Sequence, residues 1–454
     1  GLSDGERFDE WKRLYRGEAK IAVGARSAIF APLSDLGLIV IDEEHDSSYI
    51  SDSNPRYDTK DIAFKRAEMC GASVVLGSAT PSIETYRSAL TGGLTLIELI
   101  DRISSCLTPE VEIIDMTKEI RMGNSGIFSV ALKEALEQTI ERGEQAMIFI
   151  NRRGFSSFIM CAECGYTPMC SDCDVSLTYH RDVNRLKCHY CGKNYTVPQK
   201  CPKCGGTKLR HGRTGTEKVV LEIEKLFPKA KVIRMDNDTT ARKGSVVKIL
   251  EAFGKGEYNV LVGTQMIAKG HDFPLVTLVG ILDADFSLYF DDYRSAERTF
   301  QLVTQVAGRA GRADRPGRVL LQTYAPRSYV FYFASKNDYR GFYLKEANTR
   351  EVTKFPPFSK IVRVLCSSED EKEAFEATKR IYLEIKNLEK DGGFIYLNAM
   401  KSPVNRIKNK VRYQVLMRLS PERADEIIKK VYDITNNNHG KASCFVELNP
   451  QSLF

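Results

Sequence analysis

Residues 259–285 read NVLVGTQMIAKGHDFPLVTLVGILDAD and contain two short, predominantly apolar runs that are separated by a polar loop. The first run, Asn259–Val262, leads into that loop, and the second, Leu275–Leu282, ends in Asp283 and Asp285. Short apolar runs of this kind are typical of strands buried in a parallel sheet. This stretch therefore predicts two buried strands of an α/β fold.

The same alternation continues on the N-terminal side of this stretch. Helices are predicted near Thr216–Leu226 and Ser245–Phe253, with a strand at Lys231–Met235 between them. Farther upstream, a predicted helix over Lys133–Arg142 precedes a strand at Gln145–Ile150. Alternating strands and helices imply a parallel sheet with helices on both of its faces.

A second copy of the pattern lies before about residue 120. Leu38–Ile41 is a short apolar run, and Ser73–Leu76 is another, with a helix-like segment over Asp58–Cys70 between them. Two copies of one α/β pattern in a chain of 454 residues predict two lobes.

Acidic residues follow the first of these strands directly. A carboxylate at the C-terminal end of a buried parallel strand lies where open α/β sheets bind ligands. Two adjacent acids, Asp42 and Glu43, suit magnesium coordination and the orientation of an attacking water. An ordinary acidic turn is an equally good interpretation of these residues alone. The small hydroxyl residues Ser78 and Thr80 after the next strand could sense a phosphate, but they are also common in plain turns.

A basic segment near residue 310 reads QLVTQVAGRAGR, residues 301–312. A helix predicted after Arg294 would carry Gln301, Gln305, Arg309 and Arg312. Because Arg309 and Arg312 are three residues apart, they would share one face of this helix. Two guanidinium groups on one side suit a polyphosphate that arrives from another lobe. A solvated basic helix is the alternative, but two glycines among alanines are unfavourable in such a helix.

Eight cysteines form four C-x-x-C pairs within the second lobe. Two tetrahedral zinc ions need four thiolates each, so the count predicts two zinc ions per chain. The pairs are Cys161/Cys164, Cys170/Cys173, Cys188/Cys191 and Cys201/Cys204.

The zinc-binding segment has two further interpretations. A purely structural ribbon is one, and a rigid surface that contacts DNA or a protein is the other. Several aromatic or imidazole side chains could stack on bases, although packing over the zinc sites is at least as common. These residues are Tyr179, His180, His189, Tyr190 and Tyr195. The two histidines are not expected to be ligands, because the cysteines already suffice.

Composition limits the class of protein. The 454 residues include 43% hydrophobic and 28% charged residues, as in water-soluble globular proteins, and predict two to four domains. No run approaches the roughly 18 apolar residues of a membrane helix. The polar start of the chain lacks a signal peptide, so we expect a cytosolic protein in which cysteines bind zinc rather than form disulfides. The net charge of +7 permits a nucleic-acid partner without requiring one.

The last hundred residues differ from the rest of the chain in their pattern of apolar and charged residues, and this difference predicts a separate domain. Strand-like runs at Ile361–Cys366 and Arg412–Leu419 flank a charged helix over Glu371–Leu388. In Arg406–Arg412, positive charge recurs at every second residue, so on a strand Arg406, Lys408, Lys410 and Arg412 would share one face. This pattern indicates either a track for nucleic-acid phosphates or an ordinary exposed strand.

Seven features occur in one order along the chain: GARSAIFAP, LIVIDEEH, LGSATPS, FINRRGF, the eight cysteines, VGTQMIAKGHDF and QVAGRAGR. Together they resemble the primosomal protein N′ (PriA) family, the bacterial replication-restart DNA helicases of superfamily 2, over essentially the whole chain. The cysteine insertion argues against other DExH helicases. The resemblance implies ATP-dependent 3′–5′ translocation on single-stranded DNA at stalled or collapsed replication forks.

The resemblance also implies roles for individual residues around ATP and Mg²⁺. Asp42 and Glu43 match the Mg²⁺–ATP acidic motif, with Glu43 positioning the water. Gly270 and Asp272 match the G-x-D element of the second lobe, close to the nucleotide. The arginine-finger motif is matched by Gln305, Arg309 and Arg312.

Further matches concern DNA and zinc. Ser78, Ala79 and Thr80 match the motif that couples hydrolysis to DNA, and Arg56 and Tyr57 resemble the loop between the ATP site and DNA. The family's zinc pairing is nested, with Cys161, Cys164, Cys201 and Cys204 on one ion and Cys170, Cys173, Cys188 and Cys191 on the other.

The resemblance divides the chain into two RecA-like lobes, the first incomplete, and two smaller parts. We expect the C-terminal part of lobe 1 over 1–118, the start of lobe 2 over 119–157 and the zinc-binding insertion over 158–213. The remainder of lobe 2 would span 214–345, and a small α+β domain would span 346–454. The implied partners are single-stranded and forked DNA, primosome proteins and single-stranded DNA-binding protein. The resemblance also implies a monomer that acts in the bacterial cytoplasm at the replication fork.

The chain departs from the family in one large respect. The family has N-terminal DNA-binding and winged-helix domains and a P-loop, yet no G-x-x-x-x-G-K-[ST] pattern occurs in the 454 residues. Without the phosphate cradle and its lysine we expect poor ATP binding and an inactive chain. We therefore expect a fragment of a longer protein. The alternative is a non-enzymatic, zinc-containing module that binds DNA or a partner.

Overall fold

The structure is a computed structural model that divides into two compact units, residues 1–96 and 97–454. Within the described part of the chain, no helix is long and apolar enough to cross a membrane. The residues that the structure describes are 3–51, 56–99, 109–150, 159–171, 176–180, 183–188, 192–211, 215–236, 238–240, 242, 244–268, 273–290, 292–311, 317–437 and 440–450.

The first unit contains a small parallel sheet of two strands, β1 (Leu38–Ile41) and β2 (Ser73–Leu76), as predicted. The helices of this unit include α2, which begins at an N-cap where Asp58 accepts from the backbone N–H of Lys60. The helical elements are α1 (Asp4–Tyr15), η1 (Arg26–Phe30), η2 (Ser47–Tyr49), α2 (Thr59–Cys70) and α3 (Ile83–Leu90).

Only one face of this small sheet is buried. Ile39 and Ile41 form a core cluster with two alanines of α2. Leu38 and Val40, on the opposite face of β1, are 55% and 62% exposed. The prediction of a buried parallel strand is therefore confirmed for the pairing and for one face of β1 alone.

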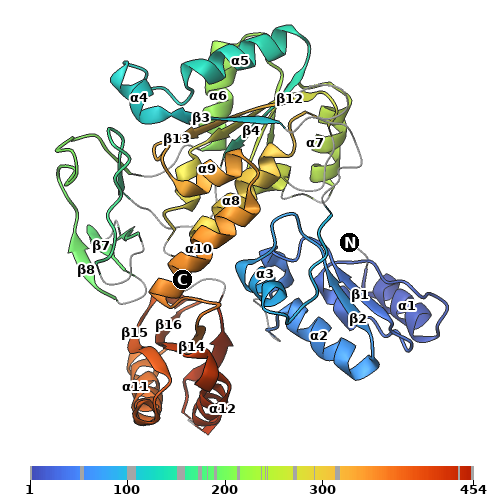
Figure 1. The fold of residues 1–454 in the computed structure, drawn as a ribbon, viewed down its shortest axis with the longest axis vertical. Coiled ribbons are helices and arrows are strands. Elements are labelled where there is room, and N and C mark those ends of the chain that lie inside the picture. The colour runs from blue at the N-terminus through green and yellow to red at the C-terminus, as the bar shows by residue number, and fades with distance from the viewer. Residues whose placement is uncertain are drawn as a thin grey trace. The chain divides into compact units, whose positions relative to one another are not determined.

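The second unit is built on a parallel sheet of six strands in the order β10-β11-β4-β12-β13-β3 (Figure 1). The four central strands are almost entirely buried, which explains their continuous apolar sequences. The strands are β3 (Glu110–Asp115), β4 (Gln145–Ile150), β10 (Val232–Met235), β11 (Val260–Gly263), β12 (Val276–Leu282) and β13 (Arg318–Thr323).

Helices cover both faces of this sheet, as the alternating sequence predicts (Figure 1). Helices α5 and α6 pack on one face through Leu132, Leu136, Val219 and Ile223. On the other side of the sheet Figure 1 shows α8 and α9. The helical elements of this lobe are α4 (Met116–Arg121), α5 (Val130–Glu141), α6 (Thr216–Leu226), α7 (Ser245–Gly254), η3 (Gln265–Ala268), η4 (Ala284–Ser287), α8 (Ser295–Ala307), α9 (Tyr329–Ser335) and α10 (Tyr339–Thr353).

The boundary between the lobes differs from the predicted division at 118/119. Strand β3 pairs in parallel with β13 at the edge of the second sheet, from Glu110↔Arg318 to Asp115↔Thr323. Residues 110–115 therefore belong to the second unit, and the compact units divide after Leu96. The sequence could not show this, because the register of an edge strand depends on a partner about 200 residues away.

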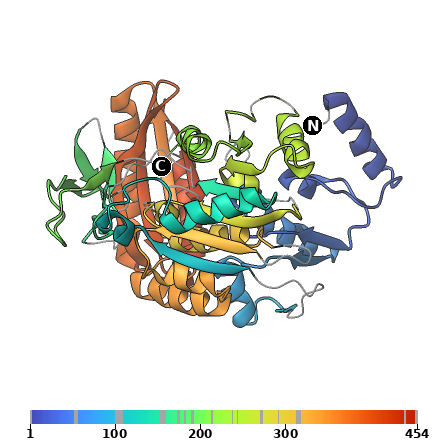
Figure 2. The ribbon, with the colours of Figure 1, turned by 90° about the horizontal axis from the view of Figure 1, so that it is seen from above.

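The cysteine-rich segment contains two small antiparallel sheets. Strands β5 (Ile159–Cys161) and β9 (Leu209–His211) pair and close the segment at its base. Strands β6 (Thr178–His180), β7 (Arg185–Lys187) and β8 (Asn194–Thr196) form the second sheet. The segment shares an apolar cluster with the C-terminal domain, and Figure 2 shows the two beside each other.

The C-terminal domain has an α+β fold, as predicted. Its antiparallel sheet has the order β15-β16-β14-β17, and two helices cover one face. Helix α10 crosses the predicted boundary at 345/346, so the sheet begins only at Lys360. The elements are β14 (Lys360–Ser368), α11 (Glu371–Leu388), η5 (Glu389–Asp391), β15 (Phe394–Ile407), β16 (Lys410–Leu419), α12 (Pro421–Asn437) and β17 (Ser443–Leu448).

The prediction that one strand carries all four charges of Arg406–Arg412 is wrong. Lys408 and Asn409 have φ values of +46° and +66° and form the two-residue turn between β15 and β16. Arg406 is paired with Val411, the neighbour of Lys410 and Arg412, and so lies on the opposite face of the hairpin from both. Reversal of the chain separates these charges, and no single-faced phosphate track forms.

Candidate functional site

The acidic turn after β1 is the first candidate site, and it lies at the carboxyl end of a parallel strand. The backbone N–H of Glu43 donates to Asp42 Oδ1 at 3.0 Å, and Glu43 itself has a φ of +48°. Positive φ is unusual for a residue with a long side chain and is concentrated at functional sites. The Asp42 side chain is exposed and that of Glu43 is half-exposed, so both carboxylates can reach a ligand.

The next residue, Glu44, has a structural role instead. Its side chain is buried and accepts hydrogen bonds from the Ser82 backbone N–H at 2.6 Å and from Lys60 Nζ at 2.7 Å. Burial lowers the pKa of Lys60, but the Glu44 carboxylate more than offsets this and holds that pKa above its ordinary value. Glu44 thus fixes the acidic turn to α2 and to the start of α3.

His45 links the acidic turn to the hydroxyl segment after β2. Its Nδ1 lies 2.7 Å from Ser78 Oγ and 3.5 Å from a carboxylate oxygen of Glu43. Ser78 Oγ also accepts from the backbone N–H of Thr80 at 3.0 Å. Glu43, His45, Ser78 and Thr80 therefore form one connected polar chain. The serine and the threonine were expected from the sequence, whereas the role of the histidine was not.

The neighbouring loop residues Arg56 and Tyr57 also belong to the first unit. The Tyr57 ring packs edge-on against Phe30, with centroids 5.0 Å apart, and Arg56 is exposed. These contacts hold Tyr57 in a partly buried position beside the core of that unit.

In the second unit, Gln305 lies in the last turn of α8, which ends at Ala307. The prediction that Arg309 continues this helix is wrong. Gly308 caps the helix, and the N–H groups of Arg309 and Ala310 make turn hydrogen bonds to Val306 and Ala307. Gly311 then has a φ of +68°, which turns the chain toward β12. Gly270, Asp272 and Arg312 lie outside the described residues.

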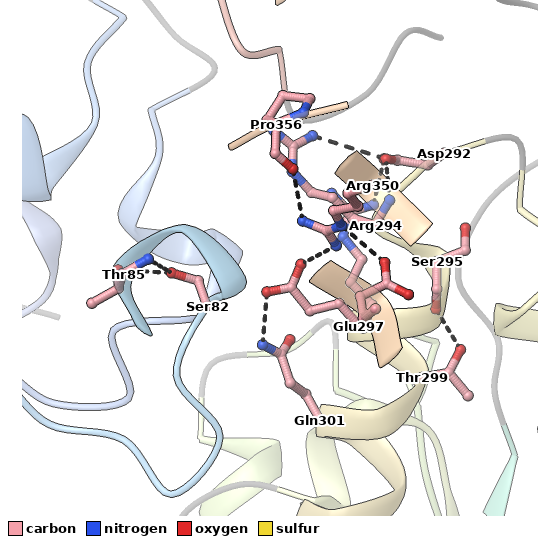
Figure 3. Close-up of polar contacts among 12 residues, drawn as sticks. Ser82, Thr85, Asp292, Arg294, Ser295, Glu297, Thr299, Gln301, Arg350 and Pro356 are labelled. Atoms are coloured by element: carbon pink, nitrogen blue, oxygen red, sulfur yellow. Dashed lines mark hydrogen bonds and ion pairs between the residues drawn. The ribbon is translucent and has the colours of Figure 1, made fainter. Parts of the chain in front are cut away.

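A buried ion-pair network anchors α8 (Figure 3). Arg350 of α10 donates to Glu297 of α8 at 2.7 Å and to Glu346 at 2.8 Å, and its side chain is only 2% exposed. Gln301, one turn after Glu297, donates to that carboxylate at 3.5 Å. Glu297, Gln301 and Gln305 lie at four-residue spacing, so the network supports the helix face that leads to Gln305. No pattern in the sequence predicted this network.

The first set of cysteines is assembled as the nested pairing implies. The Sγ atoms of Cys161, Cys164, Cys201 and Cys204 all lie within 4.8 Å of one another. Two of the sulfur pairs, Cys161–Cys204 and Cys164–Cys201, are separated by 3.7 and 3.6 Å. Tetrahedral zinc with Zn–S bonds of about 2.3 Å requires sulfurs about 3.8 Å apart. Two sulfur pairs already have this spacing, and all four thiols lie close enough together to share one zinc ion.

Glycines form part of the turns at the C-x-x-C pairs, and their positions directly after the cysteines are visible in the sequence. Three of the four pairs are followed directly by glycine, and Gly165, Gly192 and Gly205 have φ values of +71°, +76° and +73°. Each glycine N–H donates to the carbonyl of the first cysteine of its pair, at 2.8 to 2.9 Å. A side chain at Gly165 would also meet the Tyr324 carbonyl at 2.0 Å, so this glycine permits close contact with the helicase lobe.

The second set is described only in part, because Cys173 and Cys191 lie outside the described residues. Cys170 and Cys188 are buried in the apolar cluster that joins the zinc-binding segment to the C-terminal domain. The rings of Tyr179 and Tyr195 pack against the same cluster. These two tyrosines therefore face inward and do not form a platform for bases. His189 and Tyr190 lie outside the described residues.

Three family models match separate parts of the chain. The PriA DNA helicase Cys-rich region matches residues 170–194, and the helicase conserved C-terminal domain matches 213–314. The primosomal protein N C-terminal domain matches 351–451. These matches correspond in order to the zinc-binding segment, the remainder of the six-stranded lobe and the α+β domain.

Curated relatives give the same result. The Replication restart protein PriA of Bacillus subtilis is 48% identical over 95% of this chain and 54% of its own length. The proteins of that name from Synechocystis and Chlamydia trachomatis are 41% and 39% identical, over 92% and 100% of this chain. Those two matches cover 51% and 61% of the relatives. The chain thus spans little more than half the length of the curated relatives that it matches.

Proposed function

Because the chain belongs to the PriA family of replication restart proteins, we propose that it forms the motor and zinc-binding part of an ATP-dependent DNA helicase. The proposed activity is 3′–5′ translocation on single-stranded DNA at stalled or collapsed forks. The observation that supports it best is the polar chain from Glu43 through His45 to Ser78. It provides a direct route between a water-activating carboxylate and a segment that senses DNA.

The residues of the acidic turn suit Mg²⁺–ATP. Exposed carboxylates are the oxygen ligands that Mg²⁺ prefers, and it keeps several waters when bound. Asp42 would hold the metal, and Glu43 would orient the attacking water. Bound Mg²⁺ would neutralise charge on the phosphates as it develops. Gln305, Arg309 and Arg312 would contact the γ-phosphate, with Gly270 and Asp272 close to the nucleotide.

The protein's own residues would couple hydrolysis to DNA. A change in the position of Glu43 would alter its 3.5 Å contact with His45, and His45 would pass that change to Ser78 and Thr80. Arg56 and Tyr57 would link this segment to DNA. The network of Arg350 and Glu297 would hold α8 so that Gln305 keeps its position.

We further propose two zinc ions per chain. Cys161, Cys164, Cys201 and Cys204 would hold one, and Cys170, Cys173, Cys188 and Cys191 would hold the other. The proposed partners are single-stranded and forked DNA, primosome proteins and single-stranded DNA-binding protein, bound by a monomer in the bacterial cytoplasm.

DNA-stimulated ATP hydrolysis by the protein expressed from its complete gene tests the proposal. Forked DNA should stimulate hydrolysis, and Glu43→Gln should abolish it. His45→Ala should retain basal hydrolysis but lose most of the stimulation by DNA, because the link to Ser78 is cut. Equal stimulation of His45→Ala and the natural protein would contradict the proposed coupling route. No ATP hydrolysis by the natural protein with any DNA would contradict the proposed activity.

A further inference from the structure

Two cysteines outside the C-x-x-C pairs lie side by side in the sheet of the C-terminal domain. Cys366 of β14 is paired directly with Cys444 of β17, and their Sγ atoms are 2.8 Å apart. Both side chains belong to the apolar cluster between this sheet and helices α11 and α12. These sulfurs lie closer together than the sulfur pairs of the zinc site that are 3.6 and 3.7 Å apart.

The surroundings of this pair suit a disulfide rather than a metal. Structural zinc needs four ligands, and among the described residues only the four cysteines of the zinc site gather closely enough to hold an ion. Residues directly opposite each other on antiparallel strands have Cα atoms about 4.5–5.5 Å apart. Disulfides join Cα atoms about 4.4–6.8 Å apart. Rotation of the two side chains could therefore form the bond without movement of β14 or β17.

The two thiols differ in exposure and in acidity. Cys366 is completely buried, whereas Cys444 is partly exposed on the edge strand β17. A hydrogen bond from the Cys366 thiol lowers the pKa of Cys444; burial opposes this shift, and the Arg380 guanidinium of α11 adds to it. The same hydrogen bond, together with burial, raises the pKa of Cys366. The thiolate, which is the reactive form, therefore develops on the cysteine that solvent reaches.

We propose that Cys366 and Cys444 form a reversible disulfide when the protein meets hydrogen peroxide. The Cys444 thiolate attacks one peroxide oxygen, so that an S–O bond forms, the O–O bond breaks and hydroxide leaves with the proton that Cys444 released, as water. The Cys366 sulfur then attacks the sulfenic acid at Cys444. The S–S bond forms, the S–O bond breaks, and the Cys366 proton leaves with the hydroxyl group as a second water. Two thiols are thereby oxidised, one peroxide is reduced, and a dithiol reductant reverses the reaction.

The disulfide would fasten an edge strand that links two parts of the molecule. In the described sheet, β17 pairs with β14 alone. Directly after β17, the carbonyls of Asn449 and Pro450 accept hydrogen bonds from the Arg294 guanidinium at 3.3 and 3.0 Å. Arg294 is the N-cap residue of α8 in the helicase lobe. A strand with a single ladder has fewer contacts that oppose local opening, so a covalent bond to β14 would restrict the opening of β17.

The test is treatment of the zinc-loaded 454-residue chain with hydrogen peroxide, at doses that leave its zinc content unchanged. Remaining thiols are then alkylated and the peptides are mapped by mass spectrometry. We expect a cross-linked pair of peptides that contain Cys366 and Cys444, and a dithiol reductant should restore both thiols. Cys70→Ser, which removes an exposed cysteine elsewhere, should still form the cross-link. Cys366→Ala and Cys444→Ser should not, and the use of either partner keeps the test valid if one variant folds poorly.

Amide hydrogen exchange provides a second readout. Oxidation should slow exchange in β17 by at least about tenfold, because a disulfide that closes a long loop strongly constrains the open state. Strand β10, an edge strand of the six-stranded sheet, is the matched control and should exchange at an unchanged rate. Alkylation of both cysteines after peroxide treatment would overturn the inference. Oxidation of Cys444 to a sulfinic acid while Cys366 remains a thiol would also overturn it, because the second step would then not occur.

Discussion

At the scale of single residues, Arg350 is a buried charge whose stability depends on its ion-pair partners. It lies between Glu297 and Glu346 with almost no exposure, and its guanidinium also lies 5.0 Å from the centre of the Tyr293 ring. Removing one partner of a buried ion pair leaves an uncompensated charge, which costs about 3–5 kcal/mol. We expect Arg350→Met to lower the unfolding free energy of unit 97–454 by that amount, as measured by urea denaturation.

The control for this prediction is a surface pair. Arg318 lies 2.8 Å from Glu112, but both side chains are nearly half-exposed. Exposed pairs contribute only about 0–1 kcal/mol, because solvent and salt screen them. Arg318→Met should therefore be nearly neutral, and equal losses in the two variants would refute the special role of Arg350.

Asp285 is the second residue with an unusual environment. It is completely buried at the end of β12, and burial raises its pKa to about 6, although hydrogen bonds from Thr323 and from the N–H groups of Tyr324 and Ala325 oppose the shift. The folded protein therefore binds a proton that the unfolded chain releases at lower pH. Stability is lost as the pH rises from about 4 to about 6, and it stays lower above that interval.

Asp285→Asn tests this titration, because an amide has no proton to lose. The unfolding free energy of the natural chain should fall relative to that of Asp285→Asn between pH 4 and 7. The difference should not exceed about 3 kcal/mol, at about 1.4 kcal/mol per pKa unit. Asp433→Asn, at an exposed position, should show no such trend. A constant difference between Asp285→Asn and the natural chain over this range would count against a protonated Asp285.

At the scale of elements, the cysteine turns should be independent of the helicase sheet. Metal binding supplies most of the folding free energy of such small segments. Cys164→Ser should therefore reduce the zinc content from two ions per chain to one, measured by metal analysis of the reduced protein. Cys70→Ser, at an exposed cysteine far along the sequence from the C-x-x-C pairs, should retain both ions. A chain with fewer than two zinc ions before mutation would contradict the predicted count.

Strands and helices with strong local signals were predictable. The bounds of β1, β2, β4, α6 and α11 agree with the sequence analysis to the residue, because apolar runs and helical periodicity are local properties. Two other elements were not. Lys408–Asn409 reverses the chain through two left-handed residues, and neither is glycine, so the turn has no strong sequence signal. Strand β3 pairs with a strand about 200 residues away, which no local pattern reveals.

The residues of the candidate sites fall into the same two groups, those with a local sequence signal and those without one. Motif residues such as Asp42, Glu43 and the cysteines were found because their chemistry requires certain residue types at fixed spacings. His45 and Arg350 were missed because each depends on a contact between distant segments. Nothing in the local sequence marks a buried guanidinium or a bridging imidazole. Such residues become visible only when the chain is folded.

At the scale of the whole molecule, the central question is whether 454 residues suffice for ATP hydrolysis. Phosphoryl transfer depends almost wholly on positioning and on charge stabilisation. Asp42 and Glu43 offer a metal and water site, and Arg309 and Arg312 offer cations, but each needs the β- and γ-phosphates held in place. A P-loop and its lysine normally hold them, and no such pattern occurs in the sequence.

We therefore expect the 454-residue chain to show no DNA-stimulated ATP hydrolysis above the level of its Glu43→Gln variant, measured by phosphate release with single-stranded and forked DNA. ATP turnover that DNA stimulates and that Glu43→Gln removes would contradict this expectation, because other residues of the chain would then have to hold the phosphates.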